Sequence, residues 1–430
     1  MKFKLIKKLK SGVRIGHFKT KHGIIHSPFF MPVGTIGSVK GISPEELINL
    51  GAEILLANTY HLYLRPGEKT IKKLGGLHQF MGWGGPILTD SGGYQVFSLG
   101  GNKVKSQTSN LKSKEKALSK NKSLVRIMDE GVEFTSHLDG SKHLFTPEKV
   151  IQIQLDLGVD ILMPLDYCPS GKATPEEVKR SAEFTLKWAK QSKKYFDKKI
   201  QSSKFKIQTK LKIQNPKIIN NETVKQCNNL QASPALFGIV QGGLDSELRK
   251  YCAEELIKLD FDGYAVGGLA VDHETRDMWK TVELMGKILP ENKLRYLMGV
   301  GTPDDIIAAI YLGMDMFDCV LPTRLARHGC VYIKSQITNH KSQTKKLEKS
   351  ALISVDDQSS KFQLINLLNS KFRTDGSVID KNCGCPACKE GKGFSKAYIS
   401  HLIRENEMLG MRLATLHNLY QYLELVKKYQ

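Results

Sequence analysis

The sequence has no apolar run of about 18 residues, which a membrane-spanning helix would need. Its first residues, MKFKLIKKLKSG, are basic, but the apolar stretch typical of a secretory signal does not follow them. Acidic residues are scarce, with 43 Asp and Glu against 64 Lys and Arg, so the net charge is +21. We therefore expect a cytoplasmic protein without a membrane anchor. Its eight cysteines are not expected to form a disulfide framework.

Most of the excess positive charge lies in three lysine-rich stretches, which together carry +18 of the +21: 102–125, 191–230 and 334–372. All three are also rich in Ser, Asn and Gln and lack a clear apolar period. We expect them to be surface insertions. They are either solvated loops or a surface that attracts phosphate groups, and net charge does not decide between the two.

Outside these stretches, a helix–strand unit recurs at 43–58, 146–166 and 302–322. Each unit begins with Ser or Thr followed by Pro and acidic residues, which is typical of a helix start. Each expected helix ends at Leu-Gly, and an acid then leads into a short apolar strand. A further helix is predicted to start in the same way at 174.

Eight short apolar runs suit buried parallel strands: 29–33, 54–58, 86–90, 161–166, 236–241, 263–268, 295–299 and 315–319. Strands of this kind that alternate with capped helices indicate a parallel sheet with both faces covered. Their number favours an α/β fold of the (β/α)₈ TIM-barrel type over an open doubly wound sheet. No GxGxxG dinucleotide loop supports the open sheet.

Polar or flexible residues stand at the ends of these runs: Asp90, Asp166, Gln241, Gly268, Gly299 and Asp318. In a TIM barrel, the active site forms at the carboxyl ends of the strands. A single Asp after a strand is more often a turn former, but three at one end of a barrel predict a site. Between the third and fourth strands, 131–148 predicts a β-hairpin with a type I′ turn at Asp139-Gly140.

A cysteine cluster, CGCPAC, places Cys383, Cys385 and Cys388 within six residues. Three thiolates at this spacing in a cytoplasmic protein predict a zinc site. The fourth ligand has to come from another element, and spacing leaves His417 and His401 open. With four protein ligands the zinc would be structural.

Five motifs and the cysteine cluster, in this order, resemble the bacterial form of the tRNA-guanine transglycosylase family: TDSGGYQVFSLG, FGIVQGG, YAVGGLAV, YLMGVGTPDD, MFDCVLPTR and CxCxxC. The resemblance runs from about residue 12 to the carboxyl terminus. It implies a catalytic barrel over 12–372, containing the three insertions, and a zinc-binding helical subdomain over 373–430. It also implies one structural zinc ion per subunit and a homodimer. The helix after the cysteine cluster aligns well with the family, which favours His417 over His401 as the fourth zinc ligand.

The activity that the resemblance implies is that of a pentosyltransferase. It exchanges guanine at the anticodon wobble position of tRNAs with GUN anticodons for 7-aminomethyl-7-deazaguanine, in queuosine biosynthesis. Exchange with retention needs two displacements, so a carboxylate can serve as the covalent nucleophile. By resemblance, Asp318 is that nucleophile and Asp90 is the general acid/base.

The resemblance also implies the residues that hold the base: Asp166, Gln241, Gly268, Leu269, Tyr94, Met298 and Cys168. Asp166 would accept the N1–H and N2–H groups of guanine. Gln241 and the Gly268 N–H would donate to O6, and the Leu269 carbonyl would accept from the aminomethyl group. Tyr94 and Met298 would sandwich the ring.

Arg324 and Arg327, in PTRLARHG, match positions that contact the anticodon loop. Lys396 and Arg404 are further candidates for phosphate contacts. The sequence departs from the usual family pattern at Tyr167 and at Asp272-His273, where the bacterial enzymes usually have Glu and Gly-Glu.

Three other functions are alternatives to this activity. The first is a non-catalytic tRNA-binding paralogue that acts as a partner subunit, and the intact Asp90, Asp166 and Asp318 argue against it. The second is an archaeal-type enzyme that acts elsewhere on tRNA, which would carry extra RNA-binding domains. The third, an unrelated barrel hydrolase, would not explain the ordered motifs.

Overall fold

The structure is a computed structural model that describes residues 3–101, 125–214, 233–270, 275–334 and 362–430. Most of the lysine-rich stretches 102–125 and 334–372 lies outside these residues. The stretch 191–230 does so only in part, because a single helix, α7 (Pro175–Gln214), runs through its first half. The expected insertion boundaries therefore do not coincide with the ends of regular structure.

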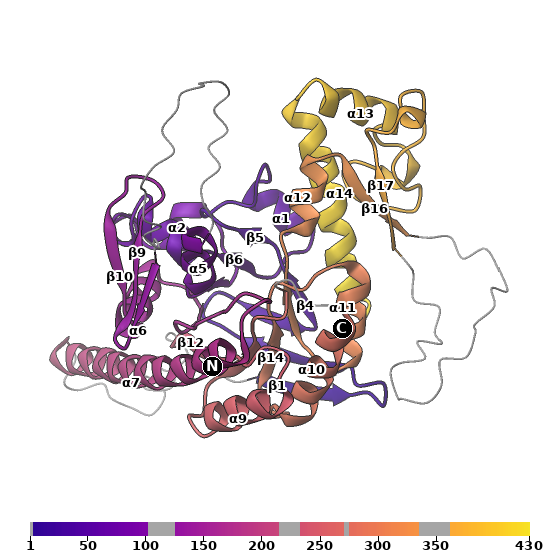
Figure 1. The fold of residues 1–430 in the computed structure, drawn as a ribbon. Coiled ribbons are helices and arrows are strands. Elements are labelled where there is room, and N and C mark those ends of the chain that lie inside the picture. Colours follow the sequence, from indigo (N-terminus) through magenta and orange to yellow (C-terminus); the bar gives the residue numbers. More distant parts are fainter. Residues whose placement is uncertain (1–2, 102–124, 215–232, 271–274, 335–361) are drawn as a thin grey trace, which may run out of the picture.

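Nine strands form one parallel sheet that closes on itself (Figure 1). They are β4 (Phe29–Met31), β5 (Val33–Gly34), β6 (Leu55–Ala57), β7 (Ile87–Thr89), β11 (Ile161–Leu162), β12 (Ala235–Val240), β13 (Gly263–Val266), β14 (Leu294–Leu297) and β15 (Met316–Asp318). Strands β4 and β5 flank Pro32, which has no N–H for the ladder. β4 pairs with β15 and β5 pairs with β6, so together they act as one strand. The predicted eight-stranded barrel is confirmed, and the open-sheet alternative is excluded.

Helices follow the strands around the barrel, and the helix starts predicted at 43, 146, 174 and 302 are confirmed. They are α1 (Pro44–Asn49), α2 (Thr59–Leu64), α3 (Glu68–Lys73), α4 (Leu77–Met81), α5 (Gly93–Gly101), α6 (Pro147–Leu157), α7, α9 (Ser246–Ile257), α10 (Thr275–Ile288), α11 (Pro303–Tyr311) and α12 (Leu321–Arg327). Ser43, Thr146 and Thr302 cap α1, α6 and α11 with their side chains, each followed by Pro in the first turn.

The acids that precede the strands have a structural role at the amino end of the barrel. Each carboxylate accepts a hydrogen bond from a backbone N–H of a neighbouring segment. Asp160 accepts from Ile87 N at 3.0 Å, and Asp315 accepts from Arg295 N at 2.9 Å. Glu53 accepts from the N–H of His26 at 2.7 Å. The recurring acid therefore holds neighbouring segments together at the amino end of the barrel, away from the carboxyl end where an active site would form.

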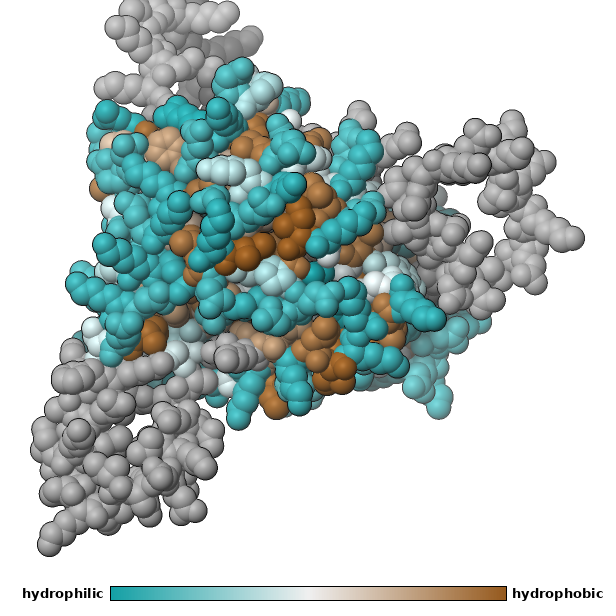
Figure 2. Space-filling view, turned by 90° about the horizontal axis from the view of Figure 1, so that it is seen from below, coloured by the Kyte–Doolittle hydropathy of each residue, from teal (hydrophilic) through white to brown (hydrophobic). Residues whose placement is uncertain are grey.

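An antiparallel sheet closes the amino end of the barrel. It comprises β1 (Phe3–Lys8), β2 (Arg14–Lys19) and β3 (Ile24–Ser27). Phe3, Phe18 and Ile25 point inward and join the buried cluster that fills the barrel. Seen from below, this end of the molecule is mostly hydrophilic, with some apolar side chains grouped near the middle (Figure 2). The interior is thus a packed core that leaves the carboxyl end for a site.

The predicted hairpin is confirmed, but its turn is not of type I′. β9 (Gly131–Thr135) pairs with β10 (Lys142–Phe145), and β8 (Val125–Met128) adds a third strand. The connection spans 136–141, closed by Ser136 N–H donating to Ser141 O at 2.8 Å. Gly140 has a positive φ of 74°, whereas Asp139 does not, and a type I′ turn needs both.

The carboxyl-terminal part stands beside the barrel and returns to it (Figure 1). It contains β16 (Cys330–Lys334), β17 (Phe362–Asn366), two short 3₁₀ helices (Ser370–Phe372 and Lys389–Gly391), α13 (Lys396–Arg404) and α14 (Met408–Lys427). α14 packs against α12, α13 and β4, so it joins the subdomain to the barrel. No helix in the described part of the chain has both the length and the apolar character to cross a membrane.

A buried ion pair at the amino end should matter more for stability than an exposed one nearby. Arg14 Nε lies 3.0 Å from Asp315 Oδ1, and neither side chain is exposed. Arg14→Met leaves a buried carboxylate without its cation, so we expect a loss of about 3–5 kcal/mol in unfolding free energy. Urea unfolding measures this loss.

The control for this prediction is Lys8→Met, which removes an exposed partner of Glu291. It should change the unfolding free energy much less. Equal effects of the two variants would contradict the assignment.

Candidate active site and metal centre

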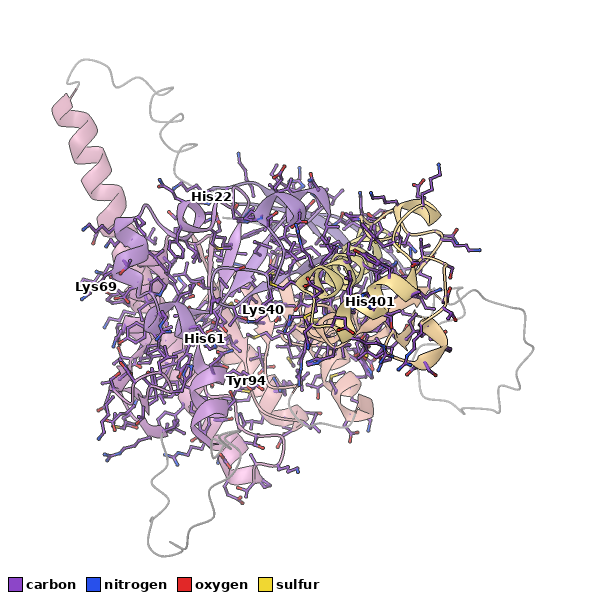
Figure 3. The ribbon with its side chains drawn as sticks, turned by 90° about the horizontal axis from the view of Figure 1, so that it is seen from above. His22, Lys40, His61, Lys69, Tyr94 and His401 are labelled. Atoms are coloured by element: carbon purple, nitrogen blue, oxygen red, sulfur yellow. The ribbon has the colours of Figure 1, made fainter. Side chains whose placement is uncertain are left out.

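Three carboxylates meet at the carboxyl end of the barrel. Asp90 follows β7, Asp166 follows β11 and Asp318 ends β15. The charges of Asp318 and Asp166 both act on Asp90, which shows that the three are near one another. In the view from above, Tyr94, His61 and Lys40 lie over this end (Figure 3). The structure therefore brings together the three Asp residues singled out in the sequence.

Asp90 is held by the residues that follow β6. Thr59 N–H donates to Asp90 Oδ1 at 2.9 Å, and the Asn58 amide donates to Oδ2. Burial raises the pKa of Asp90 to about 7, and the carboxylates of Asp318 and Asp166 add to this rise against the bond from Thr59. A carboxyl group with this pKa can both donate and accept a proton near neutral pH.

Asp318 is oriented by two donors from the neighbouring strand. The Tyr296 hydroxyl donates to Asp318 Oδ1 at 2.6 Å, and the Gly299 N–H donates to the same oxygen at 2.8 Å. Burial raises the pKa of Asp318, whereas the bonds from Tyr296 and Gly299 lower it. Oδ2 has no protein donor among the described residues.

Asp166 is the most enclosed of the three carboxylates and is tied to its neighbours on both oxygens. The Ser91 hydroxyl donates to Oδ1 and the Gln241 amide donates to Oδ2, each at 2.9 Å. The Gln241 amide also hydrogen-bonds the Cys168 side chain. Gln241 Oε1 is buried without a partner and lies 2.7 Å from where a Cβ on Gly268 would stand. Only glycine fits there, because Gly268 also has a φ of +75°.

The other residues expected to hold a base line the same end with different degrees of exposure. Leu269 and Cys168 are buried, Met298 is half-buried and Tyr94 is 49% exposed in the first turn of α5. Burial raises the pKa of Cys168 to about 12, so its thiol stays protonated. Tyr94 and Met298 are thus free to approach a planar ligand.

Tyr167, which stands where the family usually has Glu, is enclosed by protein. Its hydroxyl donates to Glu177 Oε1 at 2.9 Å, and its ring stacks on Phe97 with centroids 4.7 Å apart. The other departure, Asp272-His273, lies outside the described residues.

Two arginines follow Asp318 on α12. Arg324 is exposed, and Arg327 is half-buried with Nη1 donating to the Thr323 carbonyl at 2.8 Å. Burial and the nearby charge of Arg324 lower the pKa of Arg327. By contrast, Lys396 is already paired with Asp375 at 3.1 Å, and this carboxylate offsets the attraction of Lys396 for a phosphate. Arg404 donates to the Leu368 carbonyl at the surface.

Several site residues were not singled out from the sequence: Asn58, Thr59, Ser91 and Tyr296. Ser91 and Asn58 stand at strand ends, a position that could have marked them. Tyr296 lies inside a strand, and its sequence context is that of a core aromatic residue.

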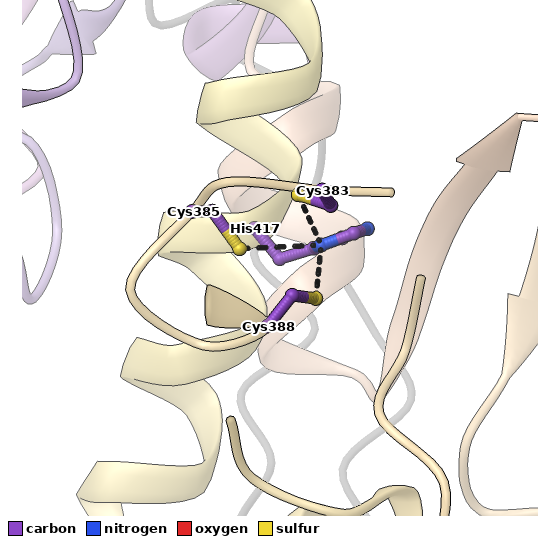
Figure 4. Close-up of side chains that lie close together, drawn as sticks. All are labelled: Cys383, Cys385, Cys388 and His417. Carbon is purple, nitrogen blue, oxygen red and sulfur yellow. Dashed lines mark hydrogen bonds between the residues drawn. The ribbon is translucent and has the colours of Figure 1, made fainter. Parts of the chain in front are cut away.

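The three cysteines converge on one histidine, and that histidine is His417 (Figure 4). Its Nδ1 lies 3.6, 3.5 and 3.4 Å from the sulfurs of Cys383, Cys385 and Cys388. His401 is exposed on α13 and is not part of the group. The choice that spacing left open is therefore settled by the fold.

The donor set fits a zinc ion. A tetrahedral ion with Zn–S of about 2.3 Å and Zn–N of about 2.0–2.1 Å sets each sulfur about 3.6 Å from the nitrogen. The observed distances lie close to this value. His417 Nε2 lies 2.7 Å from the Tyr332 carbonyl, which leaves Nδ1 as the ligand atom. All four residues are buried and leave no open position, so a bound ion would be structural.

A second group of metal-capable side chains lies at the opposite end of the barrel: His22, His78 and Asp160. Each imidazole is within 3.1 Å of the Asp160 carboxylate. However, the two rings stack, with centroids 3.6 Å apart and planes 22° apart. An ion bonded to both nitrogens would lie out of the plane of both rings, where imidazole has no lone pair. We assign this group to the closure of the barrel bottom.

A (β/α)₈ barrel with buried carboxylates at its carboxyl end and a Cys₃His group that could hold zinc defines a class of barrel enzyme with a metal-binding subdomain. The family model described as "Queuine tRNA-ribosyltransferase" matches residues 10–430, and the chain belongs to this family of transferases.

Relatives named queuine tRNA-ribosyltransferase agree with this assignment. The protein of Thermoanaerobacter sp. (strain X514) is 44% identical, over 100% of this chain and 92% of its own length. That of Halothermothrix orenii is 41% identical, over 99% and 91%. That of Methylacidiphilum infernorum is 39% identical, over 100% and 94%.

Removing one ligand should release the metal and loosen the subdomain. Cys385→Ser replaces a buried sulfur in the Cys₃His group, so we expect loss of zinc and a lower melting temperature. Elemental analysis and a thermal scan measure these quantities. Cys330→Ser, at a half-buried cysteine outside the group, should keep its zinc. A Cys385→Ser protein with a full complement of zinc would contradict the assignment.

Proposed function

We propose that this protein is a tRNA-guanine transglycosylase. It exchanges guanine at the wobble position of tRNAs with GUN anticodons for 7-aminomethyl-7-deazaguanine, in queuosine biosynthesis. The observation that carries the proposal is the trio of Asp90, Asp166 and Asp318 at the carboxyl end of the barrel, each with different partners. In a chain of this family, three differently held carboxylates support three different roles.

The first displacement makes a covalent intermediate. Asp318 Oδ2 attacks C1′ of the ribose, the C1′–N9 bond breaks and its electron pair goes to the departing guanine. Asp90 supplies the proton that the base needs to leave as a neutral molecule. Tyr296 and Gly299 hold the other oxygen of Asp318, so the attacking one keeps a fixed direction.

The second displacement reverses these roles on the same face of the sugar. Asp90, now ionised, removes the proton from N9 of the incoming base. That nitrogen attacks C1′ and the Asp318 carboxylate leaves. Two inversions give net retention. The zinc ion takes no part in these steps, because the four protein ligands fill its coordination sphere.

Recognition of the base follows from donors and acceptors that face the same end. Asp166 accepts the N1–H and N2–H groups, while the Gln241 amide and the Gly268 N–H donate to O6. The Leu269 carbonyl accepts from the aminomethyl group. Tyr94 and Met298 hold the ring faces, and Cys168 lies beside Asp166 in the wall of the site.

The tRNA partner is recognised around the reacting nucleotide. Arg324 and Arg327 stand on the helix that follows Asp318, so they are placed to contact the anticodon loop. We further propose that a homodimer binds one tRNA and that the enzyme works in the cytoplasm. The alternative is a non-catalytic tRNA-binding partner subunit. Such a subunit would not need the three carboxylates, so their presence argues against it.

Exchange of labelled guanine into a tRNA transcript with a GUN anticodon tests the reaction. The wild type should incorporate the label, and Asp318→Ala should abolish incorporation because no nucleophile remains. Asp262→Ala is a matched control, since this half-buried carboxylate accepts a hydrogen bond from Leu236 N–H at the other end of the barrel. The folded fraction of the Asp262→Ala variant should still exchange guanine. Absence of exchange in zinc-loaded wild type, with tRNA still bound, would favour the partner-subunit alternative.

The first displacement should have a bell-shaped pH dependence. Asp90 must carry its proton, and its pKa of about 7 means that this form is lost above neutral pH. Asp318 must be ionised, so protonation of its carboxyl group lowers the rate in acid. Rapid-quench measurement of the single-turnover rate should therefore show an alkaline limb near pH 7.

Asp90→Asn is the test of this assignment. The variant should be slower by about 10²–10⁴-fold and should lack the alkaline limb. An alkaline limb unchanged in Asp90→Asn would assign the proton to another group.

A further inference from the structure

Arg249 is a buried cation whose partners are backbone carbonyls. It lies on α9 and is 0% exposed. Nε donates to Gly243 O at 2.8 Å, Nη1 to Val240 O at 2.7 Å and Nη2 to Gly267 O at 2.8 Å. Burial lowers the pKa of Arg249 to about 10, so it keeps its charge at neutral pH. No carboxylate among the described residues pairs with it.

The carbonyls that Arg249 holds belong to two loops of the proposed base site. Val240 O and Gly243 O flank Gln241, after β12, and Gly267 O precedes Gly268, after β13. The Gly267 carbonyl and the Gly268 N–H are two ends of one peptide unit. In a trans peptide they point in opposite directions. A donor fixed on the oxygen therefore fixes the direction of the N–H.

The N–H end of this peptide unit and a neighbouring amide oxygen both lack hydrogen-bond partners. Within the described residues, no backbone acceptor takes the Gly268 N–H. The buried Gln241 Oε1 beside it also has no partner. The N–H of the half-buried Gly268 and the buried Gln241 Oε1, both without partners, together point to a polar ligand at this place.

We infer that Arg249 is a positioning residue that orients and polarises the Gly267–Gly268 peptide so that its N–H donates to O6 of the base. The inference rests on the proposed function. As the C1′–N9 bond breaks, its electron pair enters the purine and part of the charge reaches O6. A hydrogen bond from the cation to the carbonyl strengthens the N–H at the other end of the same peptide. That donor then acts where negative charge develops.

Arg295 provides a matched control. It too is a buried arginine bonded to three carbonyls, those of Gly286, Gly313 and Leu289, but at the amino end of the barrel. A substitution there removes the same kind of bonds without touching the base loops. Loss of stability is therefore common to both sites, and an effect on the base should belong to Arg249 alone.

The experiment compares guanine with 6-thioguanine as incoming bases for tRNA with a GUN anticodon. Both bases present the same N1–H and N2–H groups to Asp166, but sulfur is a weaker acceptor than O6. The kcat/KM for each base is measured in the wild type, Arg249→Lys and Arg295→Lys. Arg249→Gln, which keeps N–H donors without the charge, is the second variant should lysine not fold there.

In the Arg249 variants, we expect kcat/KM for guanine to fall by about 10- to 100-fold. The ratio of guanine to 6-thioguanine should fall toward one. Arg295→Lys should lower the melting temperature and leave the ratio unchanged. Wild-type exchange with an unchanged ratio in the Arg249 variants would overturn this inference alone. A wild type without exchange would overturn the proposed function, and the inference with it.

Discussion

Burial of three carboxylates at one end of a closed barrel is the constraint on which the site depends. Ionised carboxylates near one another in protein are unstable unless donors hold them, and Asp90, Asp166 and Asp318 each have such donors. The donors come from the loops after β6 and β7, from Gln241 at the end of β12 and from β14. The fold thus places around each acid the groups that make its retention possible.

The donors also distinguish the acids chemically. Asp166 has donors on both oxygens and can only accept further hydrogen bonds from a ligand. Asp318 is held on one oxygen and, in the proposed mechanism, attacks with the other. Burial raises the pKa of Asp90 to about 7, and the charges of Asp318 and Asp166 add to this rise. The proposed division of binding, attack and proton transfer among residues of one type would follow from these differences in burial and hydrogen bonding.

Much of the fold could be predicted because its signals are local. A Ser or Thr followed by Pro is a typical helix start, as at Ser43, Thr146 and Thr302. Short apolar runs are likewise typical of strands in a parallel sheet. The zinc ligands of CGCPAC were equally local. Spacing alone did not separate His417 from His401, because the choice depends on which face of α14 meets the cysteine turn.

The unpredicted features depend on contacts between distant segments. Arg249 and Tyr296 act through carbonyls and a carboxylate that only the closed barrel brings to them, and in sequence they stand in ordinary helix and strand patterns. The prediction of a type I′ turn at Asp139-Gly140 was wrong, because the hairpin loop is longer than the two residues that such a turn needs. The base-site roles themselves remain predictions from the family resemblance.

The most direct test of the account is to trap and locate the covalent intermediate. Enzyme and tRNA with a GUN anticodon are mixed and quenched in denaturant before a base can attack again. The RNA is then digested and the protein peptides are analysed by mass spectrometry. The account predicts a base-free ribose or ribose-phosphate adduct on the peptide that contains Asp318, absent in Asp318→Ala. An adduct on the Asp90 peptide, or guanine exchange by the Asp318→Ala variant, would contradict it.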